Sequence, residues 1–425
     1  MTHPSAVTSC SVAAVDAGQS ARRRLERMRW IDHWLGLPLC FLCGLGAVAA
    51  RKLFGERSRV ISGQGAIAIL KFFGLGSILE TTPLLRAIRR RYPGARLVFV
   101  TFDSCRPLVE RIGLCHEVRV IRTHSIPAFV RDVFGALVWL RRRRVEAVID
   151  LEFFSKFSTL FSFATRARIR VGFFLVDFWR RSLLTHPVYF NYFRHIADVY
   201  AHAGRRLDAP VVDATLSRLE APPAAAEGVR RFLHSHGWTE RHRLVGVNVN
   251  AGELSWERRW TAEKWIALIQ MLLDRHSDCY VVLTGSPSEQ PHVEAVAAGL
   301  PAPLRPRVLV AAGQWSFDEF VAVLPLLNVF VTGDSGPLHL AAAQGAPVVA
   351  LWGPTRPDFY SPRVPTVRNI YQDYPCSPCV CMFTTFAGMW CRHEAWCMEA
   401  IAPARVLETV EAMLAEHRPA GGNRT

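Results

Sequence analysis

Short buried strands alternate with helices along this chain, and the alternation occurs in two consecutive series. The first series has a strand at Ala66–Lys71, a helix expected from about Ile78 to Tyr92, and a strand at Arg96–Thr101. The second series runs from a strand at Leu244–Val249 to one at Val348–Trp352. Strands that alternate with helices form parallel sheets, whose faces the helices cover. The sequence therefore predicts an α/β protein with two Rossmann-like domains.

The length of 425 residues leaves room for two such domains and for extra segments at both ends. Ligands of open parallel sheets bind beyond the carboxyl ends of the strands, so two facing domains would place a site in the cleft between them. An Ala/Pro-rich stretch around 221–226 is expected in the linker region. The predicted divisions are a polar and basic tail (1–29), an apolar segment (30–54), an N-terminal Rossmann-like domain (60–225), a C-terminal Rossmann-like domain with a Cys-rich loop at 376–397 (226–402), and a final helix with a tail (403–425).

The apolar run Trp34–Ala50 holds 17 residues without a charge, which is the lower limit for crossing a hydrocarbon core. Basic residues flank it on both sides, so a single span would leave one basic cluster outside, against the positive-inside tendency. A signal peptide is an alternative, because Ala47-Val48-Ala49 resembles a cleavage site, although the leader would be unusually long. A plain buried helix is another alternative. We favour a shallow or re-entrant anchor, which keeps both clusters in the cytoplasm. Residues 30–54 are therefore predicted to associate with a membrane.

The net charge of +15 and a pI near 9.8 indicate anionic partners, such as nucleic acid, an acidic lipid surface or phosphorylated substrates. Arginine supplies nearly all of the excess, so a general bias toward arginine is the plain alternative. The sequence has no paired Cys/His zinc finger and no RNA-binding signature. We therefore predict no nucleic-acid partner.

A glycine-bearing motif, FFGLGSILETTPLL, follows the first predicted strand. Gly74 and Gly76 allow a tight turn where strand meets helix, and the N-terminus of the helix presents N–H groups and a positive dipole end. Ser77 and Glu80 have the S-x-x-E spacing of a capping box, which is the structural interpretation of both residues. The functional interpretation makes Glu80 a general base.

Paired arginines close a second motif, NVNAGELSWERRW (248–260). A strand end, a glycine turn and the side chains of Arg258 and Arg259 suit an acidic diphosphate, because arginine donates charge-assisted hydrogen bonds. A solvated basic surface is the alternative.

A third motif, TGDSGPLHLAAAQGAPVVALWGPTRP (332–357), has Asp334, Ser335, Gly336 and His339 at a strand-to-helix corner. Ser335 is expected at the N-cap, and the N–H groups of the first turn would cradle a phosphate. His339 lies one turn into the helix and would face the same pocket, although a lone histidine is more often structural.

These motifs resemble those of glycosyltransferase family 9, the lipopolysaccharide heptosyltransferase family. TGDSGPLHLAAAQGAPVVALWGPT resembles its C-terminal signature, GLGSILETTPLLRAIRRRYPGARLVFVTF its N-terminal signature, and NAG…ERRW and TGSPSE its intermediate motifs. The resemblance covers about Ala66–Val406. It implies a GT-B fold with two Rossmann-like domains, an inverting reaction and no required metal.

The resemblance also implies a donor site, residue by residue. Arg258 matches a basic residue that contacts the donor phosphates, and Glu289 matches an acid that binds the donor ribose. Asp334–Gly336 and His339 match the loop that holds the donor sugar and phosphate. The predicted donor-binding set is completed by Asn250 and Arg259.

One position departs from the family pattern. Heptosyltransferases usually have an aspartate directly after the glycine of the first motif, as the proposed base, and this chain has Ser77 there. A serine hydroxyl is a poor base at neutral pH, so an active enzyme must use another carboxylate. We predict Glu80 first, with Asp103 and Glu152 as the other candidates. Alternatively, the chain belongs to a divergent branch with another acceptor, or it is inactive.

Five cysteines gather between Cys376 and Cys397. The C-x₂-C pair of Cys376 and Cys379 could form a four-thiolate zinc site with Cys391 and Cys397, although the second spacing is looser than usual. Free thiols in a packed loop are an alternative that we favour slightly. A cytoplasmic location argues against disulfides.

The sequence thus predicts an inverting glycosyltransferase on the cytoplasmic side of a bacterial inner membrane, attached peripherally or as a monotopic protein. It would move a sugar, such as a heptose, from an ADP-sugar or another nucleotide sugar to a lipopolysaccharide-type or other envelope glycolipid. The acceptor would bind the N-terminal domain and the donor the C-terminal domain, with no cofactor required. The alternatives are a catalytically inactive donor-binding homologue that acts as a membrane partner protein, and a nucleotide-sugar epimerase of similar fold.

Overall fold

The computed structural model describes residues 27–28, 30–54, 61–153, 155–175, 178–251, 256–379, 391 and 395–416. The chain divides into two compact units, an N-terminal unit that ends at Ser217 and a C-terminal unit that begins at Arg218. The predicted tails before residue 27 and after residue 416 lie outside the described residues, as do Cys381 and much of the predicted Cys-rich loop.

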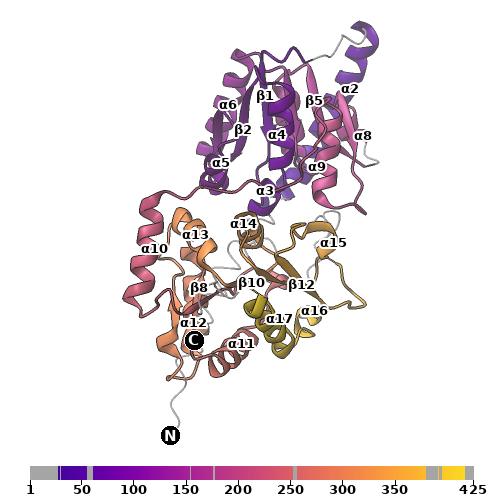
Figure 1. Cartoon of the computed structure of the whole chain (residues 1–425). Helices are drawn as coiled ribbons and strands as arrows, with labels where there is room; N and C mark the ends of the chain where they lie inside the picture. The colour runs from indigo at the N-terminus through magenta and orange to yellow at the C-terminus, as the bar shows by residue number, and fades with distance from the viewer. Residues whose placement is uncertain are drawn as a thin grey trace. The chain divides into compact units, whose positions relative to one another are not determined.

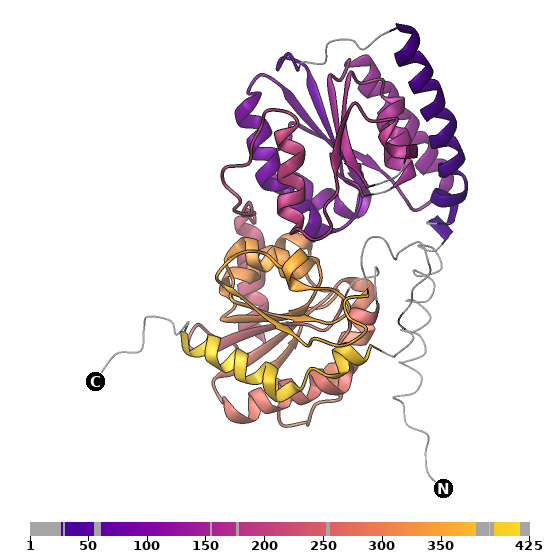
Figure 2. The ribbon, with the colours of Figure 1, turned by 90° about the vertical axis from the view of Figure 1, so that its right-hand side faces the viewer.

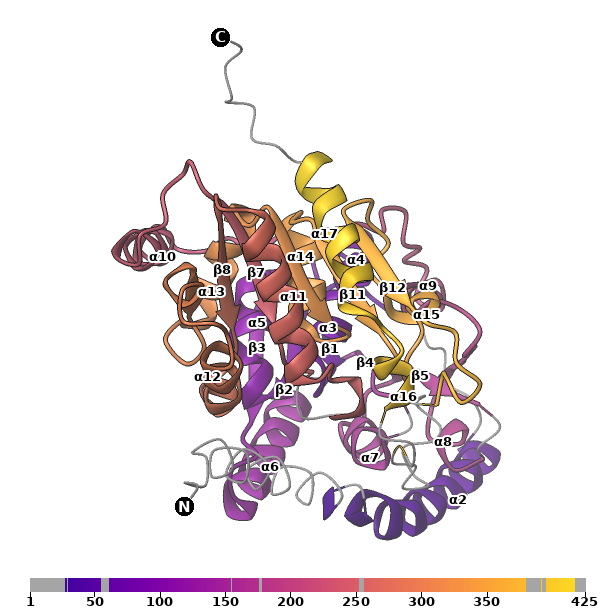
Figure 3. The same cartoon turned by 90° about the horizontal axis from the view of Figure 1, so that it is seen from below.

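The N-terminal unit is built on a six-stranded parallel sheet (Figure 1). Its strands are β1 (Ala66–Leu70), β2 (Arg96–Phe102), β3 (Glu117–Ile121), β4 (Ala147–Asp150), β5 (Ile169–Phe174) and β6 (His186–Tyr189). Its helices are α2 (Gly36–Phe54), α3 (Leu75–Leu79), α4 (Thr82–Arg91), η1 (Asp103–Cys105), α5 (Arg106–Ile112), α6 (Ile126–Arg142), α7 (Lys156–Ala164), α8 (Phe178–Arg181) and α9 (Ile196–Arg205). Helices α4 and α9 lie on one face of the sheet, and α6 and α7 lie on the other (Figure 3).

The C-terminal unit has a second six-stranded parallel sheet. Its strands are β7 (Arg243–Asn248), β8 (Cys279–Thr284), β9 (Val308–Val310), β10 (Val329–Gly333), β11 (Val348–Trp352) and β12 (Val367–Tyr371). Its helices are α10 (Pro223–Ser235), η2 (Trp256–Arg258), α11 (Ala262–Arg275), η3 (Pro287–Glu289), α12 (Gln290–Ala298), η4 (Arg305–Arg307), α13 (Phe317–Val323), η5 (Leu324–Leu326), α14 (Gly336–Gln344), α15 (Pro357–Tyr360), α16 (Trp396–Glu399) and α17 (Pro403–Glu416).

Both sheets follow the same plan, which confirms the predicted α/β fold with two Rossmann-like halves. The strand orders are β3-β2-β1-β4-β5-β6 and β12-β11-β10-β7-β8-β9. In each sheet the chain starts at a central strand, moves to one edge, and returns to build the other edge. The order therefore reverses between β1 and β4 and between β7 and β10. Ligands of open α/β sheets bind beyond the strand ends at such switch points.

The central strands are buried on both faces, which explains their continuous apolar sequences. All five residues of β1 and all five of β11 are buried. In the C-terminal unit the rings of Trp260 and Trp265 pack edge to face with centroids 4.9 Å apart. The indole N–H of Trp260 donates to the carbonyl of Ile401 at 3.2 Å. These contacts fix the end of the second sequence motif against the segment that leads into α17.

The single helix predicted from Ile78 to Tyr92 is wrong, because α3 and α4 are separate helices. Pro83 explains the break, since it has no N–H to donate to the carbonyl of Leu79. The hydroxyl of Thr82 donates to that carbonyl instead, at 2.7 Å. The glycine motif therefore contains the whole of the short helix α3 and the start of α4.

The capping box predicted for Ser77 and Glu80 is also wrong, since Gly74 is the N-cap of α3 and Glu80 its C-cap. A capping box occurs further along the chain, where Oε2 of Glu289 accepts the N–H and the hydroxyl of Ser286 at 2.8 and 2.9 Å. The Ala/Pro-rich stretch expected in the linker region contributes the start of helix α10.

The apolar N-terminal segment is helical. A stretch from Trp30 to Leu53 is long and apolar enough to cross a membrane, by length and composition. Helix α2, which forms most of it, packs on α7 and α8. Figure 2 shows α2, in indigo, along one side of the N-terminal unit.

Candidate functional site

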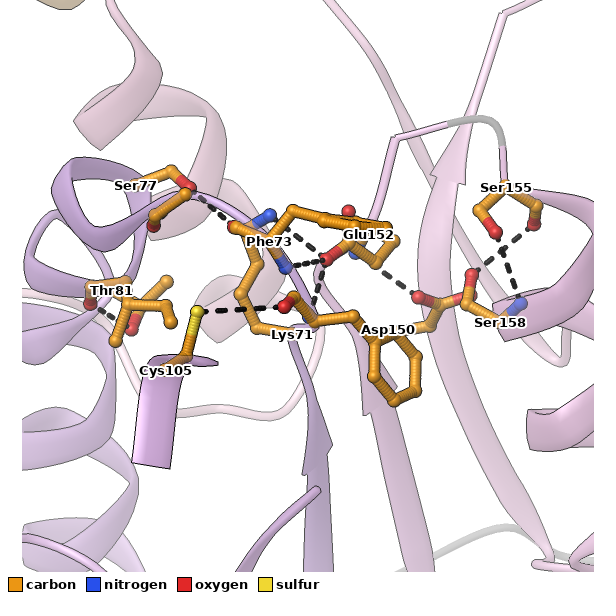
Figure 4. Close-up of polar contacts among 12 residues, drawn as sticks. Lys71, Phe73, Ser77, Thr81, Cys105, Asp150, Glu152, Ser155 and Ser158 are labelled. Atoms are coloured by element: carbon orange, nitrogen blue, oxygen red, sulfur yellow. Dashed lines mark hydrogen bonds and ion pairs between the residues drawn. The ribbon is translucent and has the colours of Figure 1, made fainter. Parts of the chain in front are cut away.

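Glu152 lies at the switch point of the N-terminal sheet, just beyond the end of β4. Its Oε1 accepts hydrogen bonds from the backbone N–H groups of Phe72 and Phe73, at 2.5 and 3.1 Å. The same oxygen lies 3.0 Å from Nζ of Lys71 (Figure 4). The side chains of Lys71 and Glu152 are only 4% and 9% exposed. One carboxylate oxygen therefore holds the start of the glycine loop that follows β1.

Asp150, the last residue of β4, supports Glu152 through the backbone. Its Oδ1 accepts the N–H of Glu152 at 3.1 Å, and its Oδ2 accepts the hydroxyl of Ser158 at 2.8 Å and Nη2 of Arg180 at 2.9 Å. Arg180 also donates to the carbonyl of Glu152 at 2.7 Å. Burial raises the pKa of Asp150 to about 6, although Arg180 acts in the opposite direction. A fully buried ion pair thus underlies the loop that carries Glu152.

The glycine loop is closed by Ser77, the residue that departs from the family pattern. Gly74 has a φ of +82°, a conformation that favours glycine, and a Cβ there would lie 2.7 Å from Oγ of Ser77. The hydroxyl of Ser77 donates to the carbonyls of Phe73 and Gly74, at 3.1 and 2.9 Å. Gly76 is buried within α3. The serine therefore stabilises the loop.

The three predicted bases have different surroundings. Glu80 is 3% exposed at the C-cap of α3. Glu152 is held by Lys71 and by the N–H groups of Phe72 and Phe73. Asp103 begins η1 and is half-buried, and its Oδ1 accepts the hydroxyl of Thr123 at 3.0 Å. The thiol of Cys105 lies 3.6 Å from the carbonyl of Phe72, so η1 runs beside the glycine loop. Asp103 is thus the most accessible of the three carboxylates.

A second polar cluster occupies the switch point of the C-terminal sheet. Nδ2 of Asn248 donates to the hydroxyls of Thr332 and Ser335 at 3.1 and 3.4 Å and to the carbonyl of Asn250 at 3.2 Å. Ser335 is the N-cap of α14, as predicted. Its hydroxyl donates to the carbonyl of Gly333 at 3.2 Å. The side chain therefore stabilises the turn between β10 and α14.

Helix α14 begins at Gly336 and carries His339 one turn further, where its side chain is buried. Pro337 has no N–H, and the N–H of Leu338 donates to the carbonyl of Ser335 at 3.2 Å. Among the described residues, the N–H groups of Ser335 and Gly336 are therefore the ones at this corner that could bind a phosphate. This is fewer than the four of an uncapped helix.

Arg258 and Asp334, both in the predicted donor-binding set, contact each other. Nη1 of Arg258 lies 3.2 Å from Oδ2 of Asp334 and 2.8 Å from its carbonyl, and Nη2 donates to the carbonyl of Ala251 at 3.2 Å. The hydroxyl of Thr355 donates to the same Oδ2 at 2.7 Å. The two charged side chains are 13% and 10% exposed. The pair joins the second motif to the third at the start of α14.

The side-chain amide of Asn250 is buried beside the end of β7. The residue is 2% exposed, and neither Nδ2 nor Oδ1 has a hydrogen-bond partner within the described part of the chain. It lies beside Gly285, where an added Cβ would come within 3.1 Å of Nδ2. An unsatisfied buried polar group is unfavourable by roughly 1–3 kcal/mol. A polar ligand that reached this amide would remove that penalty.

Arg259 and Glu289 form a third group with His292, a residue that the sequence did not indicate. Burial lowers the pKa of Arg259, and the charge of Glu289 opposes this shift. Burial and the charge of Arg259 lower the pKa of His292 to about 4, so the imidazole is neutral at physiological pH. Nε2 of His292 has no hydrogen-bond partner among the residues that the structure describes.

The sequence analysis also did not identify Lys71 and Arg180 as residues of the site. Lys71 had a signal, because it is one of only four lysines and it directly follows a buried strand. Arg180 had none, since an arginine in a short basic run is usually exposed.

The four described cysteines of the predicted zinc site influence one another. Burial and the neighbouring thiols of Cys391 and Cys376 raise the pKa of Cys379. Burial raises the pKa of Cys397 to about 11. Within the described part of the chain, Cys376, Cys391 and Cys397 are free thiols. Among the described residues, which exclude Cys381, no group of three or more His, Cys, Asp or Glu side chains is arranged to hold a metal ion.

Known proteins share both the sequence pattern and the fold. The family model for glycosyltransferase family 9 (heptosyltransferase) matches residues 140–389. Lipopolysaccharide heptosyltransferase 2 of Salmonella typhimurium is 31% identical over 371 residues, which cover 80% of this chain and 96% of the relative. A family 9 glycosyl transferase of Veillonella parvula superposes with a TM-score of 0.68 at 22% identity, over 84% of this chain and 100% of that one. The ADP-heptose lps heptosyltransferase II of E. coli gives a TM-score of 0.65 at 22% identity, over 83% and 99%.

Proposed function

This chain belongs to glycosyltransferase family 9, and from that membership we propose that it transfers a heptose to a lipopolysaccharide-type glycolipid. The Salmonella relative is named for this activity. The E. coli structure is named for ADP-heptose, and we propose the same class of donor here. The reaction is an inverting displacement, in which an acceptor hydroxyl attacks the anomeric carbon as the nucleoside diphosphate leaves.

The buried amide of Asn250, which has no hydrogen-bond partner among the described residues, carries the proposal for the donor site. It lies at the switch point of the C-terminal sheet, where nucleotides bind in open α/β folds. A nucleoside diphosphate offers both donors and acceptors to such an amide. The charge of Glu289 acts on Arg259, and the charge of Arg259 acts on His292; these three residues would contact the nucleoside.

The diphosphate would lie at the start of α14. The guanidinium of Arg258 and the N–H groups of Ser335 and Gly336 are the positive groups of this corner. They would stabilise the negative charge that develops as the sugar bond breaks. His339 and Asp334 would hold the sugar and the loop around it. These groups make a bound metal unnecessary in the proposed reaction.

The acceptor would bind the N-terminal unit beside the glycine loop. A general base must be reached by the substrate hydroxyl, and this requirement favours Asp103 over the buried Glu80. Glu152 would instead fix the loop. We therefore propose Asp103 as the base, in place of Glu80.

Purified protein tests the proposal when it is incubated with ADP-heptose and glycolipid from a strain that lacks the gene. We expect release of ADP and addition of one heptose to the glycolipid, detected by mass spectrometry. The glycolipid of the deletion strain should lack the same sugar. An unchanged glycolipid in that strain would overturn the proposal.

A second candidate function follows from Ser77. If the missing aspartate is not replaced, the chain is an inactive donor-binding homologue that serves as a membrane partner. It would bind ADP-heptose without releasing ADP. An epimerase would instead alter the nucleotide sugar without any acceptor. Parallel incubations with and without the acceptor glycolipid therefore separate all three functions.

We also propose that the protein works at the cytoplasmic face of the inner membrane. The exposed apolar surface of the stretch that includes α2 supports a peripheral or monotopic attachment. A structural zinc ion at Cys376, Cys379, Cys391 and Cys397 remains a proposal. Metal analysis of the purified protein, with thiol titration before and after unfolding, distinguishes zinc from free thiols.

A further inference from the structure

Helix α2 is fixed to the N-terminal unit through its small residues. Gly36 packs so closely on Lys156 that a Cβ would collide with that side chain, and Gly44 packs in the same way on Ser182. At the end of the helix, Nη2 of Arg51 donates to the carbonyl of Ser182 at 2.6 Å. Since these residues recur at helical spacing, one face of α2 is in contact with the unit along its length.

The chain just before α2 is fixed as well. The carboxylate of Asp32 caps α7, since its two oxygens accept the N–H groups of Lys156 and Phe157 at 3.2 and 2.7 Å. A helix that crossed a bilayer would have to break these polar contacts or bring Lys156 into the hydrocarbon. A charge at the centre of a bilayer is energetically unfavourable. The contacts that fix α2 to the N-terminal unit therefore argue against a membrane-spanning helix.

The opposite side of this stretch is apolar and faces solvent. Large apolar side chains there are between 42% and 76% exposed, and the set consists of Trp30, Ile31, Trp34, Leu35, Leu39, Phe41, Leu42, Leu45 and Leu53. Apolar side chains of this size and number are rarely left in water on a monomeric protein. The surface therefore indicates a partner.

A second exposed apolar stripe lies on α6. Ile126, Val130 and Phe134 follow one another at intervals of four residues and are 74%, 58% and 68% exposed. Helix α7 joins the two surfaces, because α2 packs on it and its Phe157 packs on Phe129 of α6 with ring centroids 5.3 Å apart. Figure 3 shows α6 and α2 on the same side of the N-terminal unit.

The charge of the chain is concentrated in the same unit. Residues 26–217 hold 30 of the 51 arginine and lysine residues but only 15 of the 36 aspartate and glutamate residues. The whole net charge of +15 therefore falls in this part of the chain, and the remainder holds 21 residues of each sign. A general bias toward arginine would not place the excess in one unit. A partner with negative charge and an apolar interior fits both observations.

We propose that the outward side of the stretch from Trp30 to Leu53 and the stripe on α6 form one surface, the bilayer face, which binds an anionic phospholipid bilayer. Helix α2 then lies in the plane of the interface with its apolar side chains among the lipids. This inference is independent of the proposed transfer reaction, since it concerns attachment alone.

Vesicle binding by the full-length protein tests the bilayer face. Leu42→Asp changes α2, and Phe134→Asp changes the stripe on α6. Val212→Asp is the matched control, because Val212 is 80% exposed and its neighbour Asp213 pairs with Arg86 of α4, on the other face of the sheet. Binding is measured by sedimentation with vesicles of phosphatidylethanolamine and phosphatidylglycerol, and with phosphatidylcholine vesicles. Thermal melting confirms that each variant is folded.

We expect Leu42→Asp and Phe134→Asp each to weaken binding about tenfold or more, because each removes an apolar side chain from the lipid phase. Val212→Asp should bind like the wild type, and phosphatidylcholine vesicles should bind less protein. Loss of binding in Leu42→Asp alone would mean that α2 is a separate anchor and would overturn the proposal. Equal loss in all three variants, loss in none, or equal binding to both kinds of vesicle would overturn it as well.

Discussion

Nζ of Lys71 lies 3.0 Å from Oε1 of Glu152, and the same oxygen accepts the N–H groups of Phe72 and Phe73. This contact joins the ends of β1 and β4 at the switch point of the N-terminal sheet. An oxygen with three donors is already satisfied, so Glu152 is better suited to hold the loop than to accept a proton from a substrate.

Lys71→Met should destabilise the protein by about 3–5 kcal/mol, because it leaves the carboxylate of Glu152 buried beside an apolar side chain. The free energy of unfolding from denaturant titration measures this loss. Lys71→Met combined with Glu152→Gln should be less destabilised than the sum of the single changes. Lys52→Met is the control, since Lys52 is exposed. A loss in Lys71→Met no larger than in this control would contradict the structural role.

Asn250→Leu should remove the hydrogen bonds that a bound nucleotide would form with the buried amide. We expect ADP to bind roughly tenfold more weakly, the usual effect of one or two lost hydrogen bonds. Without nucleotide, the variant should be as stable as the wild type or more stable, because an unsatisfied amide has been removed. Calorimetric titration and thermal melting measure the two effects.

Asn328→Ala is the control for Asn250→Leu, because it removes an amide that has a structural role. Oδ1 of Asn328 accepts the N–H of Leu244 at 2.7 Å, so its amide is structural. This variant should lose stability and keep its affinity for ADP. Unchanged ADP binding in Asn250→Leu would place the nucleotide elsewhere.

Arg258→Ala should weaken ADP binding by ~1.5–3 kcal/mol, the worth of a hydrogen bond to a charged group. Because Arg258 also holds Asp334, the effects of Arg258→Ala and Asp334→Ala should not be additive. Arg275→Ala, which removes a surface contact with Glu411, should leave binding unchanged. Affinity in Arg258→Ala equal to that in the Arg275→Ala control would contradict the assigned position of the diphosphate.

The central strands of both sheets could be predicted from the sequence, but three edge strands could not. β1 and β11 are continuous apolar runs because both faces of each strand are buried. β3, β6 and β12 lie at sheet edges, and their sequences EVRVI, HPVY and VRNIY mix charged and polar residues with apolar ones. Only their pairing with a buried neighbour defines them as strands, and the local sequence does not contain that information.

Some residues of the candidate site could likewise be predicted from the sequence, and others could not. Asn250, Arg258 and Asp334 lie in motifs that follow predicted strands, so their positions at strand ends could be predicted. Arg180 could not, because its partner Asp150 is 30 residues away in the sequence and nothing local shows that the arginine is buried. The sequence indicated which strand ends are polar, and the packing decides which charges meet there.

Stability should depend on pH through Asp150, whose pKa burial raises to about 6. The folded chain holds this proton more tightly than the unfolded chain, where an aspartate has a pKa of about 3.9. The contribution of Asp150 to stability is therefore largest below that value and falls as the pH rises toward 6. Relative to Asp150→Asn, the wild type should lose free energy of unfolding between about pH 4 and pH 6.

Asp132→Asn is the control for the sign of this effect. Hydrogen bonding with Arg122 lowers the pKa of Asp132, so its contribution is present above the unfolded pKa and is lost as the pH falls through the folded pKa. The wild type should therefore lose stability relative to Asp132→Asn only in acid. A flat difference between wild type and Asp150→Asn from pH 4 to 6 would refute the assignment.

The identity of the base can be decided by three nearly isosteric substitutions, Glu80→Gln, Asp103→Asn and Glu152→Gln. Asp103→Asn should lower turnover on the order of 10²–10⁴-fold, the usual contribution of general base catalysis, while its stability stays near that of the wild type. Glu80→Gln should retain most of the activity, because its buried side chain is out of reach of an acceptor hydroxyl. Glu152→Gln should lose stability through the loop that it holds.

Donor binding separates a catalytic effect from a structural one. The predicted donor contacts lie in the C-terminal unit, so all three variants should bind ADP like the wild type. A large loss of turnover in Glu80→Gln, with near-normal turnover in Asp103→Asn, would restore Glu80 as the base. Near-normal turnover in all three variants would remove every predicted carboxylate from that role. The hydroxyl would then have to be deprotonated by a group outside the glycine loop and its neighbours, because Ser77 itself is engaged with the carbonyls of Phe73 and Gly74.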